Sequence, residues 1–155
     1  MDKKEALSKA MAACARQEHC DNEIRGKMRA WGIDHSDIEE VIEELRKQLF
    51  LDDERYARAF VRDKLKLNGW GRIKIRYLLK GKGVESGIID KALEEIDEEQ
   101  YTSILKDLLE KKARTLKNEA NPRTRRQKLI NFALGRGFEY TEVDNVLKDD
   151  NFLKS

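Results

Sequence analysis

Apolar residues recur along the chain at intervals of three and four, a spacing that predicts helices throughout. In the first fifty residues it predicts a helix over 5–18, a second that Asp21 caps and Gly32 ends, and a third that Ser36 opens. Ser36 and Glu39 have the spacing of a capping box, and Leu49 closes the apolar stripe of this third helix. Four residues are predicted to form the apolar face of the first helix: Leu7, Ala10, Met11 and Cys14.

The same succession of three helices is predicted twice more. The second round runs from Asp52-Asp53 to about Leu67, from Arg72 to Gly83, and from Ser86 onward. The third runs from about Glu98 to Lys117, from Asn121-Pro122 to Gly137, and from Thr141 onward. Asparagine followed by proline is a strong helix start, because proline fits the first helical position and the residue before it can cap.

Three glycines align the rounds as copies of one unit. Gly32, Gly83 and Gly137 are 51 and 54 positions apart, and apolar residues recur at the same distance from each. Ile24 thus matches Ile75 and Leu129; Met28 matches Leu79 and Ala133; Ile33 matches Val84 and Phe138; Ile38 matches Ile89 and Val143; Val41-Ile42 matches Ala92-Leu93 and Val146-Leu147.

This register predicts an all-α protein made of three tandem three-helix repeats. The predicted repeats are residues 1–50, 51–97 and 98–155. Units of this size bury little surface alone, so we expect them to stack into an elongated array.

Charge is segregated along the chain although the net charge is only +2. Residues 34–54 contain nine acids and two bases, a balance of −7, and residues 85–110 have the same counts. Residues 55–84 contain ten bases and one acid, a balance of +9, and residues 111–136 contain nine bases and one acid, a balance of +8. Such blocks indicate discrete contact patches, although helices of opposite sign that pair with each other would give the same pattern.

The sequence offers little for catalysis or metal binding. Cys14, His19 and Cys20 have the wrong spacing for a zinc site, and no second pair of ligands follows. Gly69-Trp70-Gly71 lacks the frame of a phosphate loop and is interpreted as a turn. We expect no catalytic residue, no metal and no cofactor. The chain has no signal peptide or membrane span, which predicts a cytoplasmic protein, expected to be a monomer.

The basic blocks provide the candidate contact residues. They flank the Gly69–Gly71 turn and begin the matching helix of the third repeat: Arg62, Lys64, Lys66, Arg72, Lys74, Arg76, Lys80, Lys82, Arg123, Arg125, Arg126 and Lys128. Such residues suit either nucleic-acid phosphates or an acidic protein groove. Trp31, Trp70 and Tyr77 could stack on bases, although aromatic residues at helical spacing more often belong to a core.

Residues 50–84 resemble the signature of the RecX family, regulatory proteins that restrain the RecA recombinase. The matching residues are Leu51-Asp52-Asp53, Tyr56-Ala57-Arg58, Val61, Gly69-x-Gly71, Lys74-Ile75-Arg76, Leu79 and Lys82-Gly83-Val84. The chain departs from the family pattern at three positions. Arg72 stands where proline is usual, Lys74 where arginine is usual, and Leu78 where an acidic residue is common.

The resemblance implies a non-enzymatic regulator built from three tandem three-helix repeats. It implies binding in the groove of the RecA–DNA filament, with inhibition of the recombinase, ATPase and coprotease activities of RecA. Homologous recombination and the SOS response would be modulated in this way, and contact with single- or double-stranded DNA would be weak or indirect. The residues alone leave open a second possibility, a stand-alone helical DNA-binding module.

Overall fold

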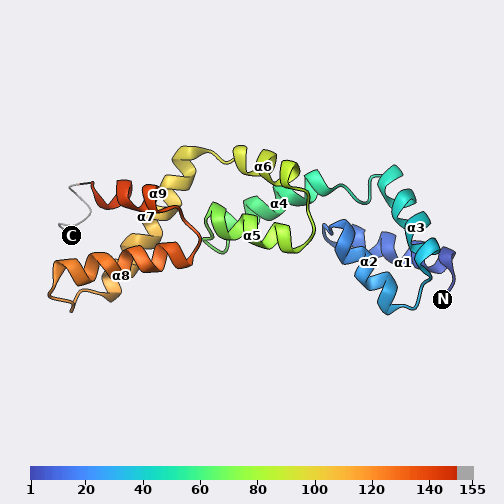
Figure 1. Cartoon of the computed structure of the whole chain (residues 1–155), viewed down its shortest axis with the longest axis horizontal. Coiled ribbons are helices and arrows are strands. Elements are labelled where there is room, and N and C mark those ends of the chain that lie inside the picture. The colour runs from blue at the N-terminus through green and yellow to red at the C-terminus, as the bar shows by residue number, and fades with distance from the viewer. Residues whose placement is uncertain (150–155) are drawn as a thin grey trace. The chain divides into compact units, whose positions relative to one another are not determined.

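A computed structural model of the chain describes residues 1–149, and within this range it contains nine helices and no strand (Figure 1). The helices are α1 Lys3–Arg16, α2 Asp21–Ala30, α3 His35–Lys47, α4 Asp53–Lys66, α5 Arg72–Gly81, α6 Ser86–Glu94, α7 Glu98–Thr115, α8 Pro122–Gly135 and α9 Tyr140–Leu147. The all-α prediction of three tandem three-helix units is confirmed. The last six residues of the predicted third repeat, 150–155, lie outside the described range.

The middle helix of each repeat ends in the same glycine cap. Gly32, Gly83 and Gly137 have φ values of +79°, +82° and +93°, the left-handed region that glycine enters at little cost. In each case the N–H of the next residue donates to a carbonyl five positions back, the bond of a Schellman cap. These bonds join Ile33 to Met28, Val84 to Leu79, and Phe138 to Ala133, at 3.1 Å each.

The apolar positions that match between repeats are buried in all three copies. None of the eighteen residues in the sequence register is more than 8% exposed. Each fully buried aliphatic side chain contributes about 1.5–3 kcal/mol relative to an exposed one, so the register sets where the core lies. Within the first repeat α1, α2 and α3 pack on one another, and within the third α7, α8 and α9 do the same.

The first repeat differs from the sequence prediction in three details. Leu49 lies beyond the end of α3, has φ +62° and is 67% exposed, so it does not extend the apolar stripe. The predicted capping box at Ser36 and Glu39 is wrong, because α3 already begins at His35 with Asp34 as its N-cap. Cys20 is the N-cap of α2, and Asp21 is the first residue of that helix.

The buried face of α1 is formed by alanines. Ala6, Ala10 and Ala13 are buried, whereas Leu7, Met11 and Cys14 lie at the edge of the core. Small side chains let the α1 backbone come close to the neighbouring helices, and this close packing determines which face of α1 is buried. Periodicity alone favoured the larger residues one position further along.

The described chain divides into two compact units. The first comprises Met1–Ala59 with Leu79–Ala92, and the second comprises Phe60–Leu78 with the chain from Leu93 onward. Each unit therefore combines one terminal repeat with part of the middle repeat.

Candidate nucleoprotein interface

In the first unit, the loop after α5 rests on the N-terminus of α2. The Lys82 carbonyl accepts a hydrogen bond from Asn22 Nδ2 at 3.1 Å and a contact from Cys20 Sγ at 3.7 Å. Lys82 Nζ lies 3.0 Å from Glu23 Oε2. Lys82, a predicted contact residue, is therefore engaged within the molecule.

The same helix start contains two groups with shifted pKa values. Burial raises the pKa of the Cys20 thiol to about 11, so this free thiol stays protonated at neutral pH. Burial also disfavours the charged form of Glu23. Hydrogen bonds from the Cys20 N–H and the Lys82 ammonium outweigh that effect and hold the pKa of Glu23 below its ordinary value.

In the second unit, the glycine-capped loop after α8 rests in the same way on the N-terminus of α5. The Gly71 N–H donates to the Arg136 carbonyl at 2.8 Å, and the Ile73 N–H donates to the Gly137 carbonyl at 3.0 Å. Between them, the Arg72 N–H donates to the Tyr101 hydroxyl at 3.0 Å. Three successive N–H groups, which a helix start leaves without intrahelical partners, are thus satisfied by the third repeat.

The Arg72 side chain is surrounded by residues of the third repeat. Its guanidinium lies 2.8 Å from Glu139 and 2.6 Å from Glu98, and it covers the Tyr101 ring at 3.8 Å from the ring centre. Burial opposes the charge of Glu139, but hydrogen bonds from Tyr101 and Arg72 hold its pKa below the ordinary value. Arg72 therefore joins α5 to the third repeat, whatever else it contacts.

The turn between α4 and α5 presents a tryptophan flanked by two lysines. Lys64 Nζ lies 5.1 Å and Lys74 Nζ 4.3 Å from the centre of a Trp70 ring, both within cation–π range. Lys64 also approaches the Phe60 ring at 5.4 Å. No carboxylate within residues 1–149 pairs with either ammonium, so both charges remain available to a partner.

A hollow of about 340 Å³ is lined in part by residues at the start of this turn. Its lining includes Lys66 from the end of α4, Asn68 from the turn, and Lys111 and Arg136 from the third repeat. Arg136 Nη1 also donates to the Asn68 carbonyl at 2.9 Å. The sequence prediction did not include Lys111 or Arg136 among the contact residues. Their place in the second basic block was a signal, but only the folded chain brings them to the turn.

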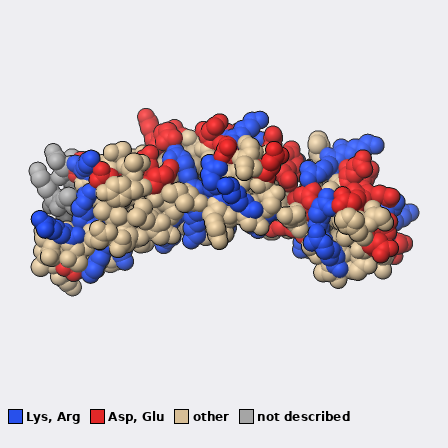
Figure 2. Space-filling view, viewed as in Figure 1, with Lys and Arg blue, Asp and Glu red and all other residues tan. Residues whose placement is uncertain are grey.

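We call this region the turn surface, defined by Lys64, Lys66, Trp70, Lys74, Lys111 and Arg136. All of its residues belong to the second unit. Figure 2 shows basic side chains gathered over α5, which supplies Lys74. Asp107 is the one acid that lines the hollow, so the turn surface is strongly positive.

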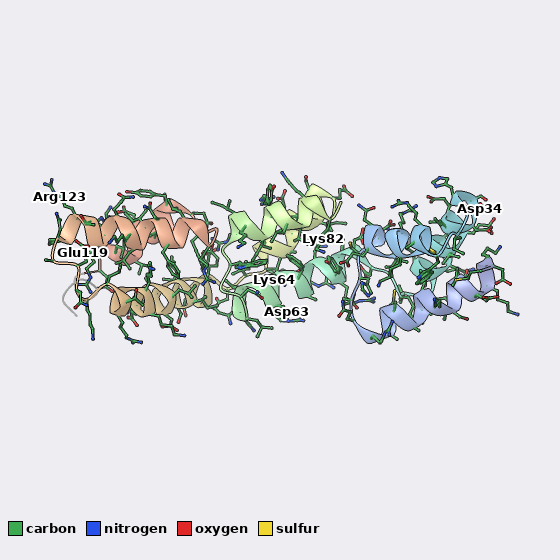
Figure 3. The ribbon with its side chains drawn as sticks, turned by 90° about the horizontal axis from the view of Figure 1, so that it is seen from below. Asp34, Asp63, Lys64, Lys82, Glu119 and Arg123 are labelled. Carbon is green, nitrogen blue, oxygen red and sulfur yellow. The ribbon has the colours of Figure 1, made fainter. Side chains whose placement is uncertain are left out.

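The remaining predicted residues are distributed differently. Arg126 pairs with Asp144 at 2.7 Å, and Lys128 pairs with Glu119 at 3.3 Å, so both tie parts of the third repeat together. Arg62 lies 3.4 Å from its neighbour Asp63 at an exposed position. Arg123 is exposed, and Figure 3 shows its side chain pointing outward from the first turn of α8.

The last three predicted contact residues lie outside the turn surface. Arg125 is half-buried, and its Nε has no partner among the described atoms. Arg76 is half-buried on α5, and Lys80 is exposed near the end of that helix. Lys80 belongs to the first unit and Arg76 to the second.

The described residues hold no cluster of three or more His, Cys, Asp or Glu side chains that could bind a metal ion. Over the same residues, no helix is long and apolar enough to cross a membrane. The fold and the turn surface together define a tandem helical-repeat protein with a strongly positive surface at the turn between α4 and α5.

Comparison with known proteins identifies the family. Models of the first, second and third three-helix domains of RecX match residues 6–45, 52–93 and 98–147. The chain therefore belongs to the RecX family. Members of this family are regulatory proteins and not enzymes, so this protein is a regulator of RecA.

Relatives and solved structures agree with this assignment. The chain is 34% identical to the regulatory protein RecX of Clostridium acetobutylicum, over 93% of this chain and 68% of the relative. It is also 34% identical to that of Prosthecochloris aestuarii, over 96% and 95%. A crystal structure of regulatory protein RecX matches with a TM-score of 0.86 and 25% identity, over 95% of this chain and 72% of that one. The crystal structure of RecX from Lactobacillus salivarius shares the fold, with a TM-score of 0.83 at 24% identity.

Proposed function

We propose that this protein binds in the groove of the RecA–DNA filament and inhibits the recombinase, ATPase and coprotease activities of RecA. It would thereby modulate homologous recombination and the SOS response, acting in the cytoplasm as a monomer. Family membership supports RecA as the partner. The turn surface supports the location of the contact, because its lysines have no carboxylate partner among the described residues.

The intramolecular contacts divide the candidate residues by expected role. A charged side chain that is already paired within the molecule contributes little to the binding of a partner, because the partner must compete with the existing ion pair. Lys82, Arg126 and Lys128 are of this kind. Lys64, Lys66 and Lys74 are not, so we assign the partner contact first to these three lysines.

The direct test measures DNA-dependent ATP hydrolysis by RecA from the same organism. We expect inhibition at substoichiometric amounts of this protein, because one molecule in the groove touches several RecA subunits. Hydrolysis that continues unchanged at equimolar protein would contradict the proposal.

Charge reversal then locates the contact. The Lys64→Glu, Lys66→Glu and Lys74→Glu triple variant is expected to lose most of the inhibition, because three attractive contacts become repulsive. The matched control reverses Lys4, Lys9 and Lys27, which are exposed lysines of the first repeat. Equal loss in both triple variants would indicate a general effect of net charge and would refute the assignment to the turn surface.

The alternative, a stand-alone DNA-binding module, is favoured by one observation, the tryptophan between two lysines. It predicts tight binding to naked DNA without RecA, with an affinity that falls steeply as salt rises. Weak binding with a shallow salt dependence would instead support the filament regulator.

A further inference from the structure

Two of the three glycine-capped loops contact the start of a helix from the preceding repeat. The loop after α5 contacts the start of α2, where the Lys82 carbonyl accepts from Asn22 Nδ2. The loop after α8 contacts the start of α5, where the Arg136 and Gly137 carbonyls accept from backbone N–H groups. Each of these contacts lies within one unit. A helix start has N–H groups without intrahelical acceptors, so exposed carbonyls of a loop are suitable partners for it.

The equivalent loop of the first repeat, residues 31–34, has no such partner among residues 1–149; we call it the Gly32 loop. No described donor forms a hydrogen bond with the Trp31 or Gly32 carbonyl. Gly32 is exposed, and a Cβ there would meet no described atom within 4 Å. A Cβ at Gly83 or Gly137 would instead overlap a residue of the helix start that the loop contacts. The cap is the same in all three loops, but the space beside Gly32 is open.

An acidic residue lies two positions after the cap glycine in every repeat: Asp34, Glu85 and Glu139. In the third repeat, Glu139 pairs at 2.8 Å with Arg72, the first residue of the helix that the loop contacts. Asp34 is exposed at the surface of the first repeat (Figure 3), and no basic side chain in the described part of the chain pairs with it. Its charge is therefore available to a base in the first turn of a partner helix.

A second copy of this chain offers no free middle-helix start to the Gly32 loop. The starts of α2 and α5 are already contacted within the molecule. The third middle helix, α8, begins fifteen residues before its cap glycine, whereas α2 and α5 begin eleven residues before theirs. This extra turn places the equivalent N–H groups inside α8, where the Arg125 N–H donates to the Asn121 carbonyl at 3.0 Å. The loop therefore fits a helix start of a different protein.

We propose that the Gly32 loop docks on an exposed helix start of a RecA subunit. The Trp31 and Gly32 carbonyls accept from N–H groups of the first turn, and Asp34 pairs with a lysine or arginine of that turn. This contact rests on the proposed function, because RecA is taken as the partner. It adds a second contact, since the Gly32 loop belongs to the first unit and the turn surface to the second.

Gly32→Asn tests the open space. Asparagine tolerates the left-handed conformation better than most residues, so the cap and the far-UV spectrum should be retained. Its side chain would fill the space that the partner helix needs, so co-sedimentation of the full chain with RecA filaments on single-stranded DNA should show about tenfold weaker binding. The matched control, Gly26→Asn, adds the same side chain at an exposed position of α2 that is equally open, and it should bind like wild type.

Asp34→Asn tests the ion pair and leaves α3 with a good N-cap residue, because asparagine caps a helix as well as aspartate does. Binding to the same filaments should weaken about threefold and become less sensitive to salt. Glu43→Gln is the control, because it removes the same charge from an exposed position further along α3 and should bind like wild type. This variant keeps the test decisive if Gly32→Asn fails to fold.

A benzophenone photocrosslinker in place of His35 identifies the partner segment. The His35 side chain is 87% exposed next to the Gly32 loop, so crosslinks should map to the first turn of a RecA helix that contains lysine or arginine. Crosslinks to a second copy of this chain, to a strand or to the interior of a helix would overturn the docking. Wild-type affinity of folded Gly32→Asn or of Asp34→Asn would also overturn it. The proposed function would survive these results as long as the wild-type chain binds and inhibits RecA, whereas no wild-type binding would overturn both.

Discussion

The ion-pair network around Arg72 offers a direct test of how the third repeat holds α5. We consider Arg72→Met, which keeps an unbranched side chain but removes the guanidinium. The Arg72 side chain is 18% exposed and its partner Glu139 is 29% exposed, so solvent screens this pair only in part. Glu98 is 72% exposed, so its ion pair with Arg72 contributes little to the free energy of unfolding.

The expected loss of stability follows from these contacts. A hydrogen bond between charged groups in a partly buried position contributes about 1.5–3 kcal/mol. The cation–π contact with Tyr101 adds about 1 kcal/mol. Methionine recovers some packing, so we expect Arg72→Met to lower the free energy of unfolding by about 2–4 kcal/mol.

A double-mutant cycle with Glu139→Gln isolates the pair. Urea unfolding followed by far-UV circular dichroism gives the four free energies, and we expect a coupling of about 1–2 kcal/mol between the two sites. Arg62→Met is the control, because Arg62 is 59% exposed and pairs only weakly with Asp63. It should change stability by less than about 0.5 kcal/mol.

The pH dependence gives an independent check. The pKa of Glu139 is lowered in the folded chain, so its stabilising effect is complete above the pKa of the unfolded state, about 4.3. That effect is lost as the pH falls through the lower pKa of the folded state. The stability difference between wild type and Glu139→Gln should therefore be constant near neutral pH and shrink below about pH 4. Two results would refute a stabilising role for this network: a coupling below about 0.5 kcal/mol between Arg72 and Glu139, or a stability difference between wild type and Glu139→Gln that does not change with pH.

Two further predictions concern the repeat register. Gly137→Ala should cost about 3 kcal/mol or more in urea unfolding, because φ is +93° and the new Cβ would lie 2.4 Å from Lys74 Cβ. Gly32→Ala should cost only about 1–2 kcal/mol, because its φ is also positive but a Cβ there would meet no described atom within 4 Å. Equal costs would show that the Gly137 contact is not tight. Leu79→Asp should unfold the middle repeat, because it would place a charge at a fully buried position, whereas Leu79→Met should cost less than about 1.5 kcal/mol. A far-UV spectrum unaffected by Leu79→Asp would refute the register.

Local physical chemistry explains how much of the fold could be predicted from the sequence. The spacing of apolar residues is a property of neighbouring positions, and so is the need for glycine at a left-handed cap. Gly32, Gly83 and Gly137 therefore located the repeats, and the matching apolar residues proved to be core. The errors occurred at helix ends and on the buried face of α1, where Ala6 and Ala13 are buried in place of the larger residues next to them. At Leu49, an apolar residue of the right period lies just past the last turn.

The candidate site was predictable only in part, because a block of like charge does not show which members find partners elsewhere in the chain. Arg72 and Lys82 belong to the same basic block as Lys64 and Lys74. Folding places carboxylates of other repeats beside Arg72 and Lys82. It places the Trp70 ring beside Lys64 and Lys74.

The sequence by itself determined the helices, the three-fold register and the family resemblance, because each depends on short-range spacing. Only the tertiary structure decided which charges are paired within the molecule and which have no carboxylate partner among the described residues. It also brought Lys111 and Arg136, distant in sequence, to the Gly69–Gly71 turn. The physical reason is that ion pairing and packing depend on distances between residues of different repeats, which no local pattern specifies.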